Sequence, residues 1–461
     1  MPPLLALLLW FILLVGLWCF DPAKGPKTSA ALWVPLIWLF IVGSRLPSQW
    51  LSGDTGQAAA ALEEGNLLDR SIFLILILLA VGILTSRSFK WGAFFAHNSA
   101  LTAFLCFALL SACWSDFPFI AFKRWFRDLG NYVVILVVLS DPRPLEAFRT
   151  LFRRLCYLLI PLSIVIVKYF PAFGRKYDDW LGTAMYLGAT TSKNMLGAAC
   201  LISGLFFFWD TFARWADRKD RRTRRIILVN VAFIAMTLWL LNLAHSATSS
   251  VCLALGCMVV AAAHSKAIQR SPVILKFLIP VSFFLYLIVA FGFGMMGNLA
   301  AAVGRNPTLT DRTAIWKILL SIHTNPLIGT GYQSFWLGPR LARVWELYTH
   351  INEAHNGYLD VYLNLGIIGL FLLGGFLIVS YQTIWRRFKP FTSLASLTLA
   401  VWTILLFYNM TEAAFQGGLL WLTFLPGALA VSERRVRTVA ESDNAGATEE
   451  LPNLPLEVTG A

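Results

Sequence analysis

Charged residues are scarce in this sequence. Only 14% of its 461 residues are Asp, Glu, Lys or Arg, whereas soluble globular domains carry about a quarter. Hydrophobic residues make up 57% and gather in long runs such as 71–84, 226–244 and 366–380. A run of about 20 apolar residues crosses the hydrocarbon core as a helix, and the period-2 alternation of a transmembrane barrel is absent. This pattern excludes a soluble domain and predicts an all-α, polytopic bundle of membrane-spanning helices.

Motifs of metal- and nucleotide-dependent proteins are also missing. The seven cysteines lie in or at the ends of apolar runs without metal-ligand spacing, as is typical of small packing residues. No Gly-rich phosphate-binding loop is present, which argues against an ATP-driven pump. Asp178 and Asp179 could attract a divalent ion, but adjacent residues on a helix point apart and no further acidic cluster accompanies them. We therefore expect neither a metal nor another cofactor.

The apolar segments predict about 12–13 spans within a single transmembrane domain, residues 1–432. Leu4–Phe20 has no positively charged leader and no small-residue cleavage site, so we expect a retained span rather than a signal peptide. The polar tail, 433–461, has no apolar period and is predicted to be a disordered cytoplasmic segment. The predicted spans are 4–20, 30–44, 70–85, 92–112, 129–140, 153–169, 194–212, 226–244, 249–264, 273–294, 358–383, 394–409 and 417–432.

Lys and Arg in short loops predict the orientation of these spans. The densely basic loop 214–225 is expected on the cytoplasmic side, and alternation then places the long segment 296–357 outside. A loop of this length in a compact protein is usually functional or disordered, and its aromatic residues and helical stretch favour function. The net charge of +13 is attributed to cytoplasmic loops facing anionic membrane lipids, not to nucleic-acid binding. We thus expect a multi-pass membrane protein whose long loop faces the external side.

Cations on the external side run against the positive-inside bias. Arg124, Arg175 and Lys193 lie in short external segments, and Arg312 lies in the long loop. One reading is recognition of an anionic ligand at the outer leaflet, because the planar fork of Arg donors suits diphosphate. The other is anchoring to the membrane surface and ion pairing with nearby carboxylates.

Arg312 and His355 carry the chemical hypothesis of the long loop. Thr310 or Asp311 can cap a short helix with Arg312 in its first turn, and Asn356 can cap the next span immediately after His355. A helix N-terminus and nearby arginines disfavour imidazolium, so His355 is predicted to be neutral and able to accept a proton. The alternative is a His that only makes structural hydrogen bonds at the membrane interface.

At these residues the sequence resembles the O-antigen ligase/polymerase family. The most specific blocks are LTDRTAIW, NPLIGTGY and AHNGYLDVYLNLGIIG in the long loop and the following span. Further similarity in KRWFRDLGN, FGRKYDDW and TTSKNMLG extends the resemblance over most of the chain, from about residue 30 to 430. The pattern is closer to the exopolysaccharide and O-antigen polymerase-like branch than to the enterobacterial ligases.

The resemblance implies a metal-independent, inverting membrane glycosyltransferase. Its donor would be an oligosaccharide on undecaprenyl diphosphate, and its acceptor a glycolipid, either another lipid-linked repeat unit or lipid A–core. Arg312 is implied to bind the diphosphate, and His355 to activate the acceptor hydroxyl. Asp311 stands where many members have Gly, and the turn AHSATSS lacks the second Arg that members commonly carry. A second diphosphate contact is then expected from Arg124, Arg175 or Lys193.

Three classes of function remain from the sequence. An enzyme of this family is favoured, and the sequence does not separate a polymerase from a ligase because donor and chemistry are shared. A transporter or flippase of a lipid-linked glycan would be expected to place ionisable residues or broken helices near mid-bilayer, and the predicted span centres carry almost none. A structural scaffold leaves the external cations unexplained.

Overall fold

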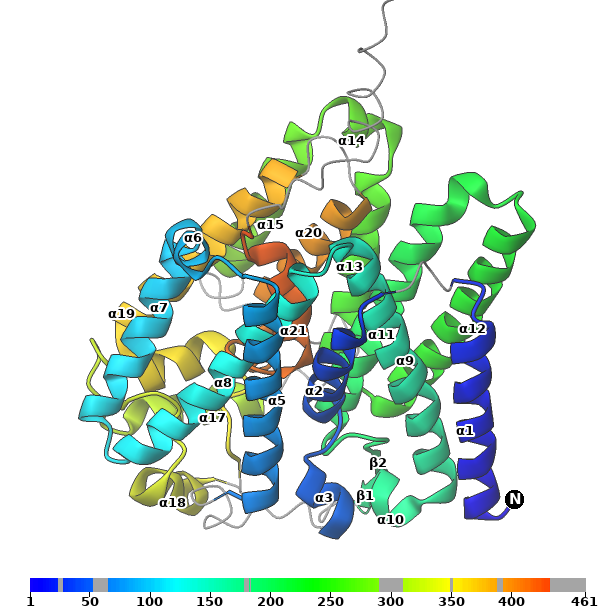
Figure 1. Cartoon of the computed structure of the whole chain (residues 1–461). Helices are drawn as coiled ribbons and strands as arrows, with labels where there is room; N and C mark the ends of the chain where they lie inside the picture. The colour runs from blue at the N-terminus through cyan, green and yellow to red at the C-terminus, as the bar shows by residue number, and fades with distance from the viewer. Residues whose placement is uncertain are drawn as a thin grey trace, which may run out of the picture.

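The computed structural model describes residues 1–23, 28–52, 65–177, 182, 184–289, 310–348, 351–387 and 393–431. Helices dominate it, with one two-stranded antiparallel sheet in the described part of the chain, which confirms the predicted all-α bundle (Figure 1). The predicted tail, 433–461, lies outside the described residues. The elements are α1 (Pro3–Phe20), η1 (Ala30–Leu32), α2 (Trp33–Gly43), α3 (Pro47–Ser52), α5 (Leu67–Ser86), α6 (Trp91–His97), α7 (Ser99–Leu110), η2 (Ser111–Trp114), α8 (Pro118–Leu139), α9 (Pro144–Tyr169), α10 (Pro171–Gly174), β1 (Arg175–Tyr177), β2 (Ala184–Tyr186), α11 (Lys193–Arg214), η3 (Trp215–Asp217), α12 (Arg221–Ala244), α13 (Ala247–Ala263), α14 (Lys266–Arg270), α15 (Val273–Leu287), α17 (Thr310–Ser321), α18 (Gly338–Leu347), α19 (Gly357–Arg387), α20 (Ser393–Tyr408) and α21 (Gly418–Ala428).

Every predicted apolar span coincides with a helix, but fewer of them are long enough to cross a membrane alone. Among the described residues, six helices pass by length and composition: α1, α5, α9, α11, α12 and α19. The segment predicted as 92–112 is broken into α6 and α7, which meet at 96°. The helices α2, α13, α15, α20 and α21 are apolar but shorter. The predicted 12–13 spans thus compare with six helices of full length among the described residues, or seven if α6 and α7 form one span.

Helix α11 runs through the centre of the bundle. Its side chains from Leu196 to Asp210 are almost all buried, and it packs against α9, α12 and α13. Gly197 permits a close approach to the turn between α12 and α13, because a Cβ there would lie 2.7 Å from Ser246 and Ser249 atoms. Small residues allow such packing between membrane helices. This packing places the N-terminus of α11 beside that turn.

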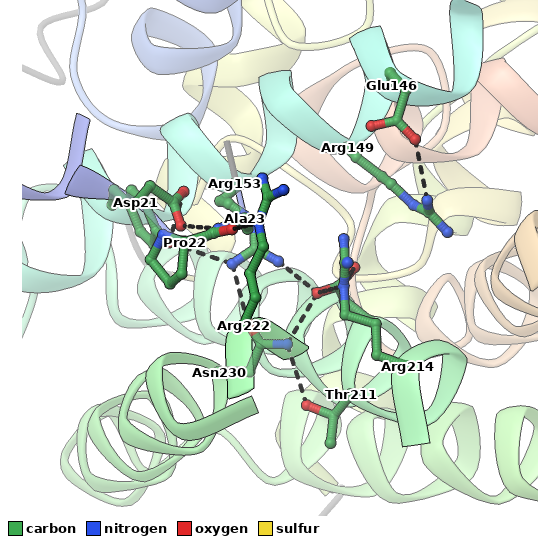
Figure 2. A network of polar contacts seen from close by, with 12 residues as sticks. Asp21, Pro22, Ala23, Glu146, Arg149, Arg153, Thr211, Arg214, Arg222 and Asn230 are labelled. Carbon is green, nitrogen blue, oxygen red and sulfur yellow. Dashed lines mark hydrogen bonds and ion pairs between the residues drawn. The ribbon is translucent and has the colours of Figure 1, made fainter. Parts of the chain in front are cut away.

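A buried ionic network ties α9, α11 and α12 together (Figure 2). The Asp210 carboxylate pairs with Arg153, accepts from Arg214 Nε at 3.0 Å, and accepts from Asn230 Nδ2 at 2.9 Å. Arg153 Nη1 also donates to Asn230 Oδ1 at 2.9 Å. Charges buried in a bundle are costly unless they are paired and hydrogen-bonded. Each member has its partners within the protein. We therefore interpret the network as a structural contact that holds the three helices together.

A break in α19 receives the external loop. Gly366 has φ 64° and ψ −165° within the helix, and the freed amides of Ile367 and Ile368 donate to Pro326 and Leu327 carbonyls at 2.9 and 3.1 Å. A Cβ on Gly366 would lie 2.3 Å from the Leu327 backbone. Backbone groups freed by a break within an apolar helix need such internal partners. The loop carrying Arg312 is thus joined to the helix that follows His355.

The two ends of the molecule differ in the segments that they carry. Figure 1 shows the basic helix α14 at one end and α3, α10 and α18 at the opposite end. The N-terminus lies at the end of α18, as expected if both are external. Which of the two ends faces the outside stays a prediction from the basic loops.

Cysteine labelling with a membrane-impermeant reagent should test that orientation. In a background with the native cysteines replaced, Glu346→Cys in α18 should be labelled from outside and Lys219→Cys only after permeabilisation. Both positions are exposed, whereas Ser334 in the same external loop is fully buried and unsuitable. Labelling of position 346 only from the cytoplasmic side would reverse the topology and remove the external site.

Candidate active site

Glu412 is the centre of a polar cluster drawn from four segments. Its Oε1 accepts from Arg312 Nη2 of α17 at 2.7 Å. Its Oε2 accepts from Asn194 Nδ2 at the start of α11 at 2.9 Å and lies 3.4 Å from His355 Nδ1. Glu353 Oε1 lies 2.9 Å from the same His355 nitrogen. The structure therefore brings the two residues predicted to be catalytic, Arg312 and His355, onto one carboxylate.

Helix α17 is held to the residue before His355. Ile315 and Leu319 of α17 are buried in a separate external core with residues of α18 and the loop before it. On the same helix, Trp316 Nε1 donates to the Ala354 carbonyl at 2.9 Å. The Asp360 carboxylate accepts from Ala354 N at 3.3 Å and from Trp336 Nε1 at 2.9 Å. These bonds fix the approach of the chain to His355 relative to Arg312.

The start of α19 sets the position of the imidazole. Asn356 Oδ1 accepts from Leu359 N at 3.1 Å, which confirms the predicted N-cap. His355 itself has φ 47°, a conformation that is uncommon for a residue other than Gly. Gly357 N donates to the carbonyls of Asn409 and Glu412 at 2.9 and 3.0 Å. The turn that carries Glu412 is therefore hydrogen-bonded directly to Gly357, two residues after the histidine.

The environment of His355 differs from the sequence-based expectation. Burial lowers the pKa of His355, but hydrogen bonds and negative charge from Glu353 and Glu412 outweigh it and raise the pKa to about 10. The imidazole is therefore protonated at neutral pH in this substrate-free arrangement. The prediction of a neutral His355 is wrong for this state, because it weighed the helix terminus and arginines and not the two carboxylates. Ion pairing at these distances exceeds a helix-terminus effect.

The same carboxylates bear on the question of a metal. Glu353, His355 and Glu412 bring three possible donor atoms within 4.8 Å of one another, which no other group does in the described ranges. Arg312 and the His355 ring already face these carboxylates, so two cationic groups balance two anionic ones. We assign the cluster to ion pairing rather than to a metal site. Asp178 and Asp179 lie outside the described residues, and the absence of a metal stays a prediction.

The three further cations predicted to bind diphosphate have different surroundings. Lys193 is exposed and directly precedes Asn194, which places it beside the cluster at the N-terminus of α11. Arg124 donates to the Gln333 carbonyl at 2.5 Å and so helps to hold the external loop on α8. Arg175 donates to the Val167 carbonyl at 3.0 Å, and its guanidinium lies 5.6 Å from the Tyr186 ring centroid. Of the three, Lys193 is the one next in sequence to a member of the cluster. Its neighbour Asn194 bonds the Glu412 carboxylate that also contacts Arg312 and His355.

Three members of the cluster were not singled out from the sequence. Glu353 is two residues before His355, Glu412 lies in the external turn 411–416, and Asn194 follows Lys193. A usable signal was available for Glu412, since it is a charged residue between two apolar runs that were predicted as spans, 394–409 and 417–432. Its distance from Arg312, 100 residues along the chain, hid the contact.

These features define a polytopic α-helical protein of the membrane type with an Arg–carboxylate–His cluster formed by Arg312, Glu412 and His355. Residues 231–374 match a protein-family model described as O-antigen ligase; the match includes Arg312, Glu353 and His355 and ends before Glu412. The chain is also 26% identical over 307 residues to the exopolysaccharide production protein ExoQ of Rhizobium meliloti (strain 1021). That similarity covers 60% of this chain and 63% of the relative, so the match spans less than two thirds of the relative's length.

Both matches support the resemblance to the O-antigen ligase/polymerase family that the loop blocks indicated. The apolar helices and the family-model match together indicate a multi-pass membrane protein.

Proposed function

We propose that this protein transfers an oligosaccharide from undecaprenyl diphosphate to a sugar hydroxyl of an acceptor glycolipid on the periplasmic face of the bacterial inner membrane. The observation that carries the proposal is the convergence of Arg312 and His355 on Glu412. A diphosphate leaving group needs a cation, and an attacking hydroxyl needs a proton acceptor. Both residue types lie within one external cluster.

Arg312 would hold the departing diphosphate. Its guanidinium is partly buried against Glu412. To bind an anionic donor, the guanidinium would either bond Glu412 and the phosphate oxygens at the same time or replace the bond to Glu412 by bonds to phosphate. Arg forms short, charge-assisted bonds with both kinds of group. Lys193, exposed beside Asn194, would supply a second positive charge to the same ligand. This replaces the second Arg that family members commonly carry after the span matching α12.

His355 would take the proton of the acceptor hydroxyl. With Nδ1 directed at the carboxylates, Nε2 is the ring nitrogen left for the acceptor. The hydroxyl oxygen forms a bond to the anomeric carbon, the bond from that carbon to the diphosphate oxygen breaks, and the diphosphate leaves with the electron pair. The hydroxyl proton moves to Nε2 of the neutral ring. Because the ring is protonated without substrate, a proton must first leave it.

Transport of a lipid-linked glycan is the second candidate function. The buried Arg153–Asp210 pair is an ionisable group inside the helices, as carriers have. However, Asp210 is already bonded to Arg153, Arg214 and Asn230 (Figure 2), which suits a static clamp. The external cluster at Glu412 favours bond-making chemistry at one face over passage between faces.

Release of polyprenyl diphosphate distinguishes the two functions. Membranes that contain the protein, a lipid-linked oligosaccharide and an acceptor glycolipid should release undecaprenyl diphosphate in step with formation of an extended glycan. A transporter would move the intact lipid-linked glycan without breaking the sugar–phosphate bond. In cells that lack the protein, accumulation of single lipid-linked repeat units would indicate a polymerase, and accumulation of long lipid-linked chains would indicate a ligase.

A further inference from the structure

Two carboxylates face one nitrogen of His355, and they are not equivalent. Glu353 lies at 2.9 Å and Glu412 at 3.4 Å from Nδ1. The Glu353 side chain is 38% exposed, whereas that of Glu412 is 6% exposed. One N–H group needs one acceptor to orient an imidazole. One of the two carboxylates is therefore not needed to orient the ring and is available for another role.

Glu412 has little hydrogen-bonding capacity left for a ligand. Its Oε1 accepts from Arg312 and its Oε2 accepts from Asn194, with His355 on the same oxygen. Its backbone carbonyl also accepts from Gly357. A buried carboxylate held in this way is fixed, since moving it would leave Arg312 and Asn194 without their partner. Glu412 is thus suited to orient the imidazole throughout the reaction.

Glu353 has the opposite character. Within the part of the chain that the structure describes, its carboxylate has one side-chain partner, the His355 ring. It lies on the segment between α18 and α19, on the external face and two residues from the proposed base. A carboxylate offers about four lone-pair sites, so most of its acceptor capacity remains for a ligand. Adjacent sugar hydroxyls are donors that a carboxylate can bind in pairs.

We infer that Glu353 is a binding residue for the acceptor sugar, accepting hydrogen bonds from hydroxyl groups next to the one that attacks. This inference rests on the proposed function. When the acceptor binds, Glu353 exchanges the His355 N–H for sugar hydroxyls, and Glu412 alone keeps hold of Nδ1. The attacking hydroxyl is then fixed beside Nε2.

The exchange also prepares the base. Loss of the Glu353 hydrogen bond removes one of the interactions that raise the pKa of His355, so the imidazolium releases its Nε2 proton to water more readily. The neutral ring can then take the hydroxyl proton as the glycosidic bond forms and the diphosphate departs. The charged and titratable groups that act on the ring are Glu353, Glu412 and Asp360. Arg312 and Tyr408 interact with Glu412 in turn.

Steady-state kinetics of Glu353→Gln test the inference. The variant loses the charge-assisted acceptor, so the KM for acceptor should rise by about tenfold to hundredfold, while the KM for the lipid-linked donor stays within about twofold. The acid limb of the pH profile of kcat/KM for the acceptor should move to lower pH, because a neutral amide no longer raises the pKa of His355 in the free enzyme. Glu353→Asp keeps the charge on a shorter side chain and should raise the acceptor KM without that downward shift. Glu346→Gln, an exposed external carboxylate paired with Arg343, is the matched control and should behave as wild type.

The results for Glu353→Gln either support or overturn the proposed role of Glu353 in acceptor binding. A selective rise in acceptor KM together with the downward shift of the acid limb supports the role of Glu353. An unchanged acceptor KM, an equal rise for donor and acceptor, or an unmoved acid limb overturns it, and leaves the proposed function intact if His355→Ala is still inactive. Folding of each variant is verified by its detergent-solubilised elution profile. An active His355→Ala enzyme would instead remove the general base on which both proposals depend.

Discussion

Replacing His355 by Ala is expected to lower the rate of glycosyl transfer by about two to four orders of magnitude, the usual contribution of a general base. His355→Gln should be nearly as inactive, because an amide keeps a hydrogen bond to Glu412 but cannot take a proton. Binding of the lipid-linked donor should remain largely intact in both variants, since the imidazole contacts the acceptor. Donor binding and turnover, measured separately in membranes, check this expectation. If His355→Gln restored activity, the histidine would have only a structural hydrogen bond.

The pH dependence of the wild-type enzyme adds a second readout of His355. The dependence of kcat/KM reports groups in the free enzyme, and that of kcat reports the substrate complex. Because the pKa of His355 is raised to about 10 without substrate, kcat/KM for the acceptor should still be rising where an ordinary imidazole is already neutral. The base must be unprotonated to act, so activity falls as pH falls through that value. The acid limb of kcat should lie at lower pH, since acceptor binding withdraws Glu353 from the ring.

Removal of Arg312 is expected to have an effect of similar size. Loss of an electrostatic contact to the developing negative charge typically costs about 10²–10³-fold in rate, so Arg312→Ala should lose most activity. Arg312→Lys keeps the charge but loses the planar fork of donors, and should be intermediate and closer to Ala. Initial rates at saturating acceptor, with protein amounts normalised by immunoblot, measure both variants.

The structure adds a control for Arg312. In Arg312→Ala the buried Glu412 loses its 2.7 Å ion pair and keeps only Asn194 and the longer contact to His355. A buried charge that loses its main partner destabilises a protein. Pairing the change with Glu412→Gln removes that charge, so the double variant should recover expression and thermal stability without recovering transfer. Recovery of full activity in the double variant would show that Arg312 serves only to neutralise Glu412.

Local sequence pattern was sufficient for the membrane bundle. Long apolar runs must be helical in lipid, where every backbone group needs an internal partner, and each predicted span coincides with a helix. Pattern could not give the number of full crossings. Two interruptions are not visible in the hydropathy pattern: the break of 96° between α6 and α7, and the non-helical Gly366 within α19. In α19 the backbone contacts at this break are with residues 326 and 327, which the hydropathy of the helix does not reveal.

The sequence by itself also pointed to the two residues that carry the proposed chemistry. Arg312 and His355 each lie in a short motif block that can be recognised without knowing which other segments lie nearby. Only the tertiary structure decided their electrostatic state. Glu412 is 57 residues from His355 and Asn194 is 218 residues from Glu412, yet both belong to the cluster. Coulombic interactions depend on distance in space and on burial, not on separation along the chain. The charge on His355 therefore followed from which carboxylates the fold brought within 3.4 Å of the ring.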